Sequence, residues 1–198
     1  AFDYPRRAEL FRGELEALLL MAREQHRDPL DYQGSYAGAL GLPQFLPSSV
    51  RNYAVDFDGD GQIDLLGSPK DAIGSVARYM QMHGWEAGGP VAVRASLDAD
   101  THLEPLLAND INPAFDAATL ARHGVRAAGT PETAGKAAFV ELVTPGEASE
   151  YWLGYQNFYV ITRYNRSSFY AMSVFQLGEA VKAARAAASA RDTQARAR

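Results

Sequence analysis

Four aspartates fall within nine consecutive positions of this chain, in the stretch VDFDGDGQIDLLG at residues 55–67. They are Asp56, Asp58, Asp60 and Asp64. Like charges this close together repel one another, so folding them into a compact loop is costly unless a cation neutralises them. The stretch constrains the fold more than any other part of the chain, because it predicts a loop built around a metal ion.

The spacing of these residues is typical of a calcium loop of the EF-hand type. Such a loop takes side-chain oxygens from positions 1, 3 and 5, has glycine at 6, uses a backbone carbonyl at 7 and often a water-mediated ligand at 9. Counted from Asp56, the sequence has aspartates at 1, 3, 5 and 9, Gly61 at 6 and Gln62 at 7. The alternative is a turn rich in Asx residues whose charges are solvated.

The end of the loop departs from the EF-hand pattern. Position 12, which holds a bidentate Glu in an EF-hand, is Gly67 here. The next carboxylate is Asp71, at the start of DAIGSVARYM, which is expected to form a helix. We infer a lengthened loop over residues 56–71 that Asp71 closes. Calcium is favoured over magnesium as the ion, because many oxygens from a flexible loop suit the larger ion.

Composition excludes several classes of protein. The chain has 198 residues, which suits one domain or a domain with a modest insertion. Its hydrophobic fraction of 47% is ordinary for a globular protein, and its net charge of −5 gives no basic surface for nucleic acid. It contains no cysteine, so disulfides play no part. No run of about 18 apolar residues occurs, so we expect no membrane span in this chain.

Periodicity divides the chain into helical and mixed segments. Helices are predicted over 6–26 and 68–84, and another from about Ser167 to Ala188. GPVAVRAS and KAAFVELVTP are predicted to be short strands, with FDAATLARHGV as a short helix between them. We therefore expect a first core segment at 1–87, a small α+β insertion at 88–150, a helical return at 151–190 and a frayed tail at 191–198.

One candidate ligand-binding segment is GSYAGALGLPQFLPSS, residues 34–49. Its glycines and prolines form a backbone that can approach a ligand closely. It offers neutral hydrogen-bonding groups and no Lys or Arg, which suits a polyol or amide better than a phosphate: Ser35, Gln44, Ser48 and Ser49. The alternative is a connecting segment packed by Leu40, Phe45 and Leu46.

The second candidate is the aromatic segment from Tyr151 to Tyr170, which also contains Asn157 and Asn165. Flat rings with a polar edge suit sugars, whose C–H faces stack while their hydroxyls form hydrogen bonds. For about half of these rings, burial in the core is the stronger interpretation.

Taken together, several blocks resemble the membrane-bound lytic murein transglycosylase B family in order and spacing. They are FDYPRRAELFRGELEALLLMAREQ, GSYAGALGLPQFLPSS, YAVDFDGDGQIDL, DAIGSVARYMQMHGW and NFYVITRYNRSSFYAMSVFQLGEAV. The resemblance covers most of the chain outside 88–150. It implies an α+β, mainly α fold: a lysozyme-like helical core with a small inserted domain and an EF-hand-like calcium loop.

The resemblance also implies an activity. The reaction is cleavage of the β-1,4 bond between N-acetylmuramic acid and N-acetylglucosamine in peptidoglycan, with formation of a 1,6-anhydro product and without consumption of water. One Glu serves first as acid and then as base, which differs from the two-carboxylate scheme of ordinary glycosidases. Matched position by position, the implied sugar-binding residues are Ser35, Gln44, Tyr164, Asn165 and Tyr170. The implied Ca²⁺ ligands are Asp56, Asp58, Asp60, Gln62 through its carbonyl, and Asp71, although the stretch before Asp71 is slightly longer than in the family.

The catalytic Glu of the family lies in a block before YPRRAE, so we expect that residue upstream of Ala1 and none in this chain. Glu14 and Glu16 belong to a different block, and on a helix they point about 200° apart, so they cannot act as a pair. Glu14 is close to the face of Leu18 and is expected to be structural.

Three hypotheses follow for the function. The first is a lytic transglycosylase, whose chain by itself is expected to be inactive without the catalytic Glu. The second is a non-catalytic, calcium-stabilised module that binds peptidoglycan. The third is a calcium-responsive interaction protein, which is disfavoured because sensors pair their EF-hands and this chain has one such loop.

The resemblance further implies a periplasmic location, with anchoring at the outer membrane through an N-terminal part absent from this sequence. Peptidoglycan strands are the expected partners. Cell-wall synthases are additional candidate partners, which no motif in the chain identifies.

Overall fold

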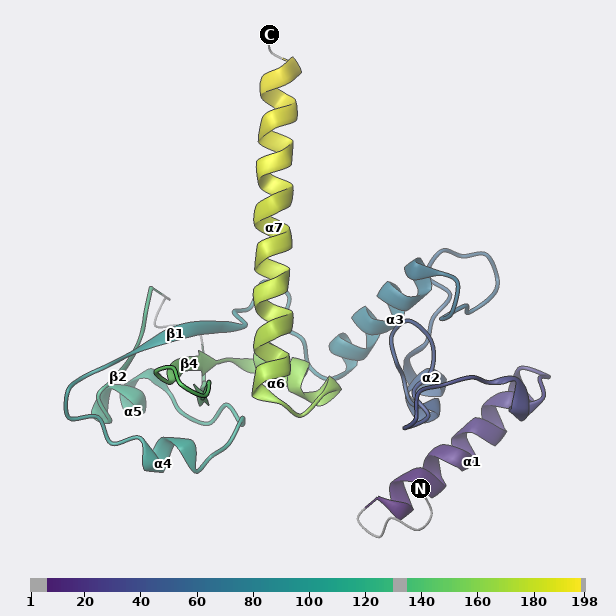
Figure 1. The fold of residues 1–198 in the computed structure, drawn as a ribbon, viewed down its shortest axis with the longest axis horizontal. Coiled ribbons are helices and arrows are strands. Elements are labelled where there is room, and N and C mark those ends of the chain that lie inside the picture. The colour runs from purple at the N-terminus through teal and green to yellow at the C-terminus, as the bar shows by residue number, and fades with distance from the viewer. Residues whose placement is uncertain (1–6, 130–134, 197–198) are drawn as a thin grey trace. The chain divides into compact units, whose positions relative to one another are not determined.

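A computed structural model of the chain describes residues 7–129 and 135–196. The chain divides into two units, Ala1–Met82 and His83–Arg198, whose elements Figure 1 labels and colours along the chain. Helices joined by loops make up the described part of the first unit, and the second contains a four-stranded sheet with helices. This mixture agrees with the predicted α+β, mainly α class.

In the first unit, the predicted helices over 6–26 and 68–84 are confirmed as α1 and α3. The elements in chain order are α1 (Ala8–Glu24), the short 3-10 helix η1 (Pro29–Asp31), α2 (Pro47–Tyr53) and α3 (Pro69–Met82). Helix α1 buries Ala17, Met21 and Ala22, and of these only Ala22 belongs to the apolar spacing that predicted the helix. Leu15 and Leu19, on its other side, are 40% and 50% exposed.

Two sets of contacts hold the helices of the first unit together. Arg51 on α2 donates from Nη2 to Oε1 of Glu24 on α1 at 2.7 Å and from Nε to Oε2 at 3.0 Å. Phe45, which is 2% exposed, packs its ring against Tyr53 and Tyr79, with centroid distances of 6.5 and 5.7 Å. The segment between α1 and α2 is thus anchored in the core just before α2 begins.

The second unit is built on an antiparallel sheet with strand order β2-β1-β4-β3. Its strands are β1 (Ala92–Leu97), β2 (Val125–Ala127), β3 (Ala138–Leu142) and β4 (Glu150–Gly154). The strands predicted in GPVAVRAS and KAAFVELVTP are confirmed as β1 and β3. The boundary expected at residue 150 falls on the first residue of β4, which is a central strand that the sequence pattern did not identify.

Successive side chains on a strand point to opposite faces of the sheet, and here each face packs against a hydrophobic cluster. Val140 of β3 joins one cluster with Phe158 and Met172, and its neighbour Phe139 joins a second cluster with Leu106. One face is therefore covered by α6 (Gln156–Tyr164) and the start of α7 (Ser168–Arg196). The other is covered by α4 (Glu104–Leu107) and α5 (Ala117–Arg122), and α5 confirms the short helix predicted there.

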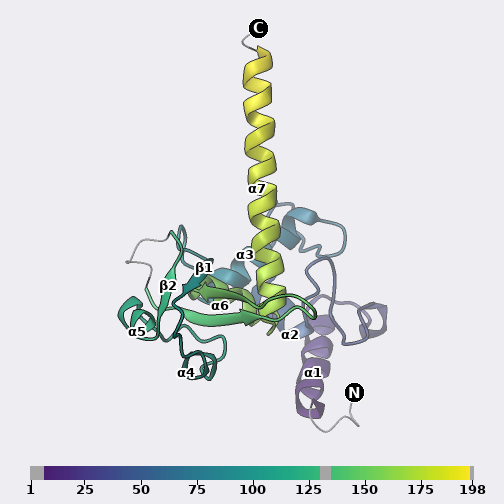
Figure 2. The ribbon, with the colours of Figure 1, turned by 60° about the vertical axis from the view of Figure 1, so that its left-hand side comes forward.

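Helix α7 is longer than predicted. It was expected to end near Ala188 and to be followed by a frayed tail at 191–198, but it continues to Arg196 and appears as one uninterrupted helix in Figure 2. The reason is local: the sequence after Gly178 contains many Ala and Arg residues and neither Gly nor Pro, so nothing stops the helix. No helix in the described ranges is both long and apolar enough to cross a bilayer.

Phe158 is the residue whose loss we expect to damage the second unit most clearly. It is fully buried, and its ring lies so close to Gly154 that a Cβ at that glycine would be 2.6 Å from Cδ1. Phe158→Ala should lower the free energy of unfolding by about 3–5 kcal/mol, measured by urea denaturation. The matched control is Phe169→Ala, because Phe169 is 50% exposed. Equal losses in the two variants would contradict this description of the core.

Candidate functional site

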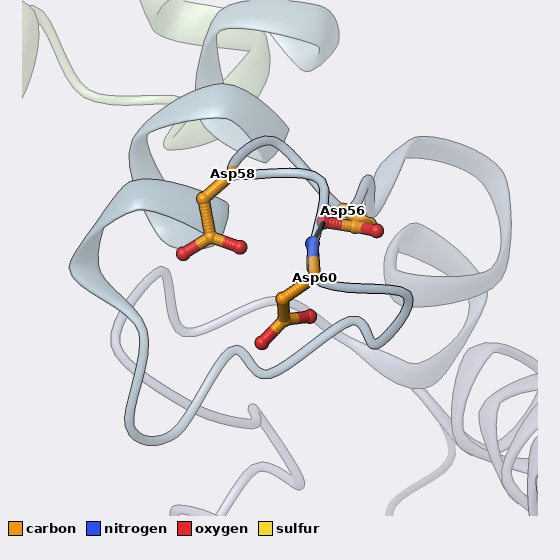
Figure 3. A group of neighbouring side chains, drawn as sticks. All are labelled: Asp56, Asp58 and Asp60. Atoms are coloured by element: carbon orange, nitrogen blue, oxygen red, sulfur yellow. Dashed lines mark hydrogen bonds between the residues drawn. The ribbon is translucent and has the colours of Figure 1, made fainter.

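The acid-rich stretch forms a tight turn around its own backbone amides. Asp56 accepts hydrogen bonds at Oδ1 from the amides of Gly59 and Asp60, at 2.7 and 3.2 Å, and at Oδ2 from Gly61 at 2.8 Å. Asp60 accepts at Oδ1 from the amide of Gln62 at 2.8 Å. Figure 3 shows the side chains of Asp56, Asp58 and Asp60 around this turn.

The three carboxylates together fit a cation. Oxygen atoms of Asp56, Asp58 and Asp60 all lie within 4.8 Å of one another. Asp58 also lies 3.8 Å from Nζ of Lys70, an exposed lysine that supplies only part of the neutralising charge. Carboxylate oxygens converging from a flexible loop are the donor set that a hard cation such as Ca²⁺ prefers.

Asp71 lies outside that group and is bound to the loop backbone. It is 1% exposed, with Oδ1 accepting from the amide of Phe57 and Oδ2 from that of Asp64, both at 2.9 Å. Hydrogen bonds from the Asp64 and Phe57 amides lower the pKa of Asp71 below its usual value. Its charged form therefore stabilises the fold at neutral pH, and this contribution is lost as the pH falls through the lowered pKa.

The segment 34–46 is a compact double turn. Leu40 bridges to Gly34 on one side and to Phe45 on the other. Ser35 accepts at Oγ from the amide of Ala39 at 3.2 Å, which holds the first turn. The second turn contains Gln44, a non-glycine residue with φ of 52°. Such backbone strain is tolerated only where the surrounding structure enforces it, and it is concentrated at functional sites.

The acidic loop supports this double turn directly. The amide of Leu42 donates to the carbonyl of Leu65 at 2.8 Å. Gly41 has φ of +66°, and a Cβ there would be 2.5 Å from the same carbonyl oxygen, so glycine is required for the close approach. The candidate metal loop and the candidate sugar-binding segment are therefore in contact within the first unit.

A groove of about 360 Å³ runs between α1 and the double turn. Its walls include Phe11 and Leu15 from α1, and Ser35 and Tyr36 from the double turn. Tyr36 is fully exposed. It is not among the predicted site residues, although a tyrosine within a glycine-rich segment is a recognisable signal for an exposed ring. An apolar groove with an exposed ring and hydroxyl groups suits a sugar.

The remaining predicted site residues belong to the second unit. The rings of Tyr164 and Tyr170 are nearly parallel, with centroids 6.4 Å apart and planes 3° apart. Asn165 is exposed at the end of α6, next to Arg166, whose Nη2 is 2.8 Å from Oδ2 of Asp110. Three other rings of the aromatic segment are buried in the core: Trp152, Tyr155 and Phe158.

Comparison with known proteins gives consistent matches. A profile of the transglycosylase SLT domain matches residues 1–179. Membrane-bound lytic murein transglycosylase B of Escherichia coli (strain K12) is 49% identical over 185 residues, which are 93% of this chain and 49% of that protein. The chain thus spans about half the length of this curated relative.

Solved structures agree in fold. The soluble lytic transglycosylase SltB1 from Pseudomonas aeruginosa matches with a TM-score of 0.83 and 48% identity, over 93% of this chain and 61% of that one. The Escherichia coli lytic transglycosylase Slt35 in complex with calcium matches with a TM-score of 0.80 and 49% identity, over 93% and 57%. These matches confirm the resemblance that the sequence blocks indicated, and the chain belongs to the transglycosylase SLT domain family.

Proposed function

We propose that this chain supplies the glycan-binding groove of a peptidoglycan lytic transglycosylase. The reaction cleaves the β-1,4 bond between N-acetylmuramic acid and N-acetylglucosamine and forms 1,6-anhydro-N-acetylmuramic acid. The observation that carries the proposal is the groove beside the double turn at 34–46, in a chain 49% identical to a lytic murein transglycosylase. Ser35 and Gln44 are the sugar-binding residues of the first unit, and Tyr164, Asn165 and Tyr170 those of the second.

The chemistry needs one carboxyl group that changes role. As an acid it protonates the glycosidic oxygen, so that the bond from the anomeric carbon breaks and the leaving sugar carries a hydroxyl. As a base it then takes the proton of the 6-hydroxyl while that oxygen bonds to the anomeric carbon. The oxygen of the sugar replaces water as the nucleophile, and the product is one water lighter than a hydrolysis product.

Glu14 is not our candidate for this acid. Both of its carboxylate oxygens accept hydrogen bonds from Ser48, Oε2 from the backbone amide at 2.9 Å and Oε1 from the hydroxyl at 2.7 Å. Glu16 is exposed and also lies outside the groove lining. Neither Glu14 nor Glu16 is therefore assigned as the catalytic acid in this proposal.

Calcium has a structural role in this proposal. Its ligands are Asp56, Asp58, Asp60, the carbonyl of Gln62, and Asp71. The calcium complex of Slt35 and the convergence of the three aspartates support this assignment. Bound calcium neutralises the acidic turn, which in turn supports the double turn through Leu65.

The substrate sets the location. Peptidoglycan lies outside the cytoplasmic membrane, so we place the protein in the periplasm, at the outer membrane, in keeping with a relative described as membrane-bound. Cell-wall synthases are candidate partners there.

The first prediction concerns the products. Purified peptidoglycan incubated with the 198-residue chain and calcium should bind it in a pull-down assay. Mass spectrometry of the supernatant should show that any muropeptide released is one water lighter than the hydrolysis product. Hydrolysis products would refute the transglycosylase mechanism. Binding without release would show that this chain binds glycan without supplying the acid, and absence of binding would refute the proposal.

The second prediction concerns Gln44. Gln44→Ala removes a group that hydrogen-bonds the sugar, and affinity for a GlcNAc–MurNAc tetrasaccharide should fall roughly fivefold to tenfold in calorimetry. The melting temperature should fall only slightly, because Gln44 is exposed but its Nε2 also donates to the carbonyl of Gly41 at 2.9 Å. Gln176→Ala, at an exposed position on α7, is the matched control. Unchanged affinity in Gln44→Ala would remove this residue, which lies in the double turn but not in the groove lining, from the proposed sugar-binding residues.

The third prediction concerns the metal. Chelation of calcium should lower the melting temperature by about 5–10 °C relative to calcium at 100 times Kd. The double variant Asp58→Ala, Asp60→Ala should melt at that lower temperature with or without calcium. The pair Asp98→Ala, Asp100→Ala removes the same charge from exposed positions and should keep the full response. A wild-type melting temperature that chelation does not move would rule out a structural metal.

A further inference from the structure

Glu14 makes a contact that neither the implied chemistry nor the calcium site uses. It lies in the middle of α1, half-buried, and reaches across 34 positions of sequence to Ser48. Its two carboxylate oxygens take one hydrogen bond each from the amide and the hydroxyl of that single residue. Charge-assisted bonds of this kind are among the stronger hydrogen bonds in proteins.

Ser48 is in the first turn of α2, directly after the double turn. Leu46 precedes α2, and Phe45 before it is buried. The backbone pair Leu40 and Phe45 exchanges two hydrogen bonds, of 2.7 and 3.1 Å, which enclose the strained turn that contains Gln44. The position of α2 relative to α1 therefore decides where this end of the double turn lies.

We propose that Glu14 is a positioning residue for glycan binding. By holding Ser48, its carboxylate fixes the end of the double turn so that Gln44 keeps its left-handed backbone and Ser35 faces the groove. Glu14 itself lines the same groove, together with Ser35 and Tyr36. The expected effect of Glu14 on glycan affinity rests on the proposed function. Its expected effect on the double turn rests on the geometry alone.

A second contact between the same two helices separates this role from general stability. Arg51 and Glu24 pair at the far end of α2 from the double turn, with two bonds of 2.7 and 3.0 Å. Removing Arg51 loosens α2 from α1 but leaves Ser48 bound to Glu14. The two ends of one short helix therefore provide a test and its control.

Conservative and disruptive changes of Glu14 should differ sharply. In Glu14→Gln the amide oxygen can accept from the Ser48 backbone, and the amide nitrogen can donate to the hydroxyl, so the contact is kept. Glu14→Ala removes both bonds. Ser48→Ala keeps the backbone bond and loses the hydroxyl bond, so it should be intermediate. Ser48→Ala also allows exchange and affinity to be measured if Glu14→Ala does not fold.

The experiment measures three quantities on the 198-residue chain and these variants. They are the melting temperature, amide hydrogen exchange at Leu40, Gln44 and Phe45, and affinity for a GlcNAc–MurNAc tetrasaccharide. We expect Glu14→Ala to accelerate exchange at these amides and to weaken affinity, each by at least about tenfold. Glu14→Gln should match the wild type in both. Arg51→Ala should lower the melting temperature while leaving exchange and affinity unchanged.

Several results would overturn the inference. Wild-type exchange rates in both Glu14→Ala and Ser48→Ala would show that Glu14 does not hold the turn. If Arg51→Ala accelerated amide exchange as much as Glu14→Ala does, the role of Glu14 would be helix packing and not positioning of the turn. If the wild-type chain binds no glycan, the proposed function fails, while the exchange comparison still decides whether Glu14 positions the turn.

Discussion

The buried carboxylate of Asp71 organises the first unit. A buried charge is tolerated only when hydrogen bonds or counter-charges replace the lost water, and here the amides of Phe57 and Asp64 do so. These two donors lie seven positions apart within the acid-rich stretch. One side chain at the start of α3 therefore closes the loop, in which oxygen atoms of Asp56, Asp58 and Asp60 lie within 4.8 Å of one another.

The closed acidic loop has a second role, as a support for the double turn at 34–46. The carbonyl of Leu65 accepts from the amide of Leu42, and Gly41 allows this close approach because it has no Cβ. From the opposite direction, Ser48 ties the end of the double turn to Glu14. A segment with little regular structure, containing a strained Gln44, is thus held from two sides. Such support is what a binding loop needs if its groups are to meet a ligand without prior ordering.

The second unit contributes a different kind of surface. Its sheet is buried on both faces, and the helices that cover one face carry Tyr164 and Tyr170 near their junction. Parallel rings and an exposed amide at Asn165 suit a sugar polymer, which is why these residues are proposed as sugar-binding groups. In the proposed reaction these groups bind and orient the glycan.

Much of the local structure could be predicted from the sequence, because it depends on neighbours in the chain. The periodicity of apolar residues predicted α1 and α3, alternation predicted β1 and β3, and the spacing of aspartates predicted that Asp56, Asp58 and Asp60 would converge. The extension of α7 to Arg196 is also a local effect, since nothing in its sequence ends the helix. Only the tertiary structure decided that Asp71 binds loop amides, that β4 is a central strand, and that Glu14 holds Ser48. Each of these depends on contacts between residues separated by other elements, and no periodicity or spacing specifies which partner a side chain meets once the chain has folded.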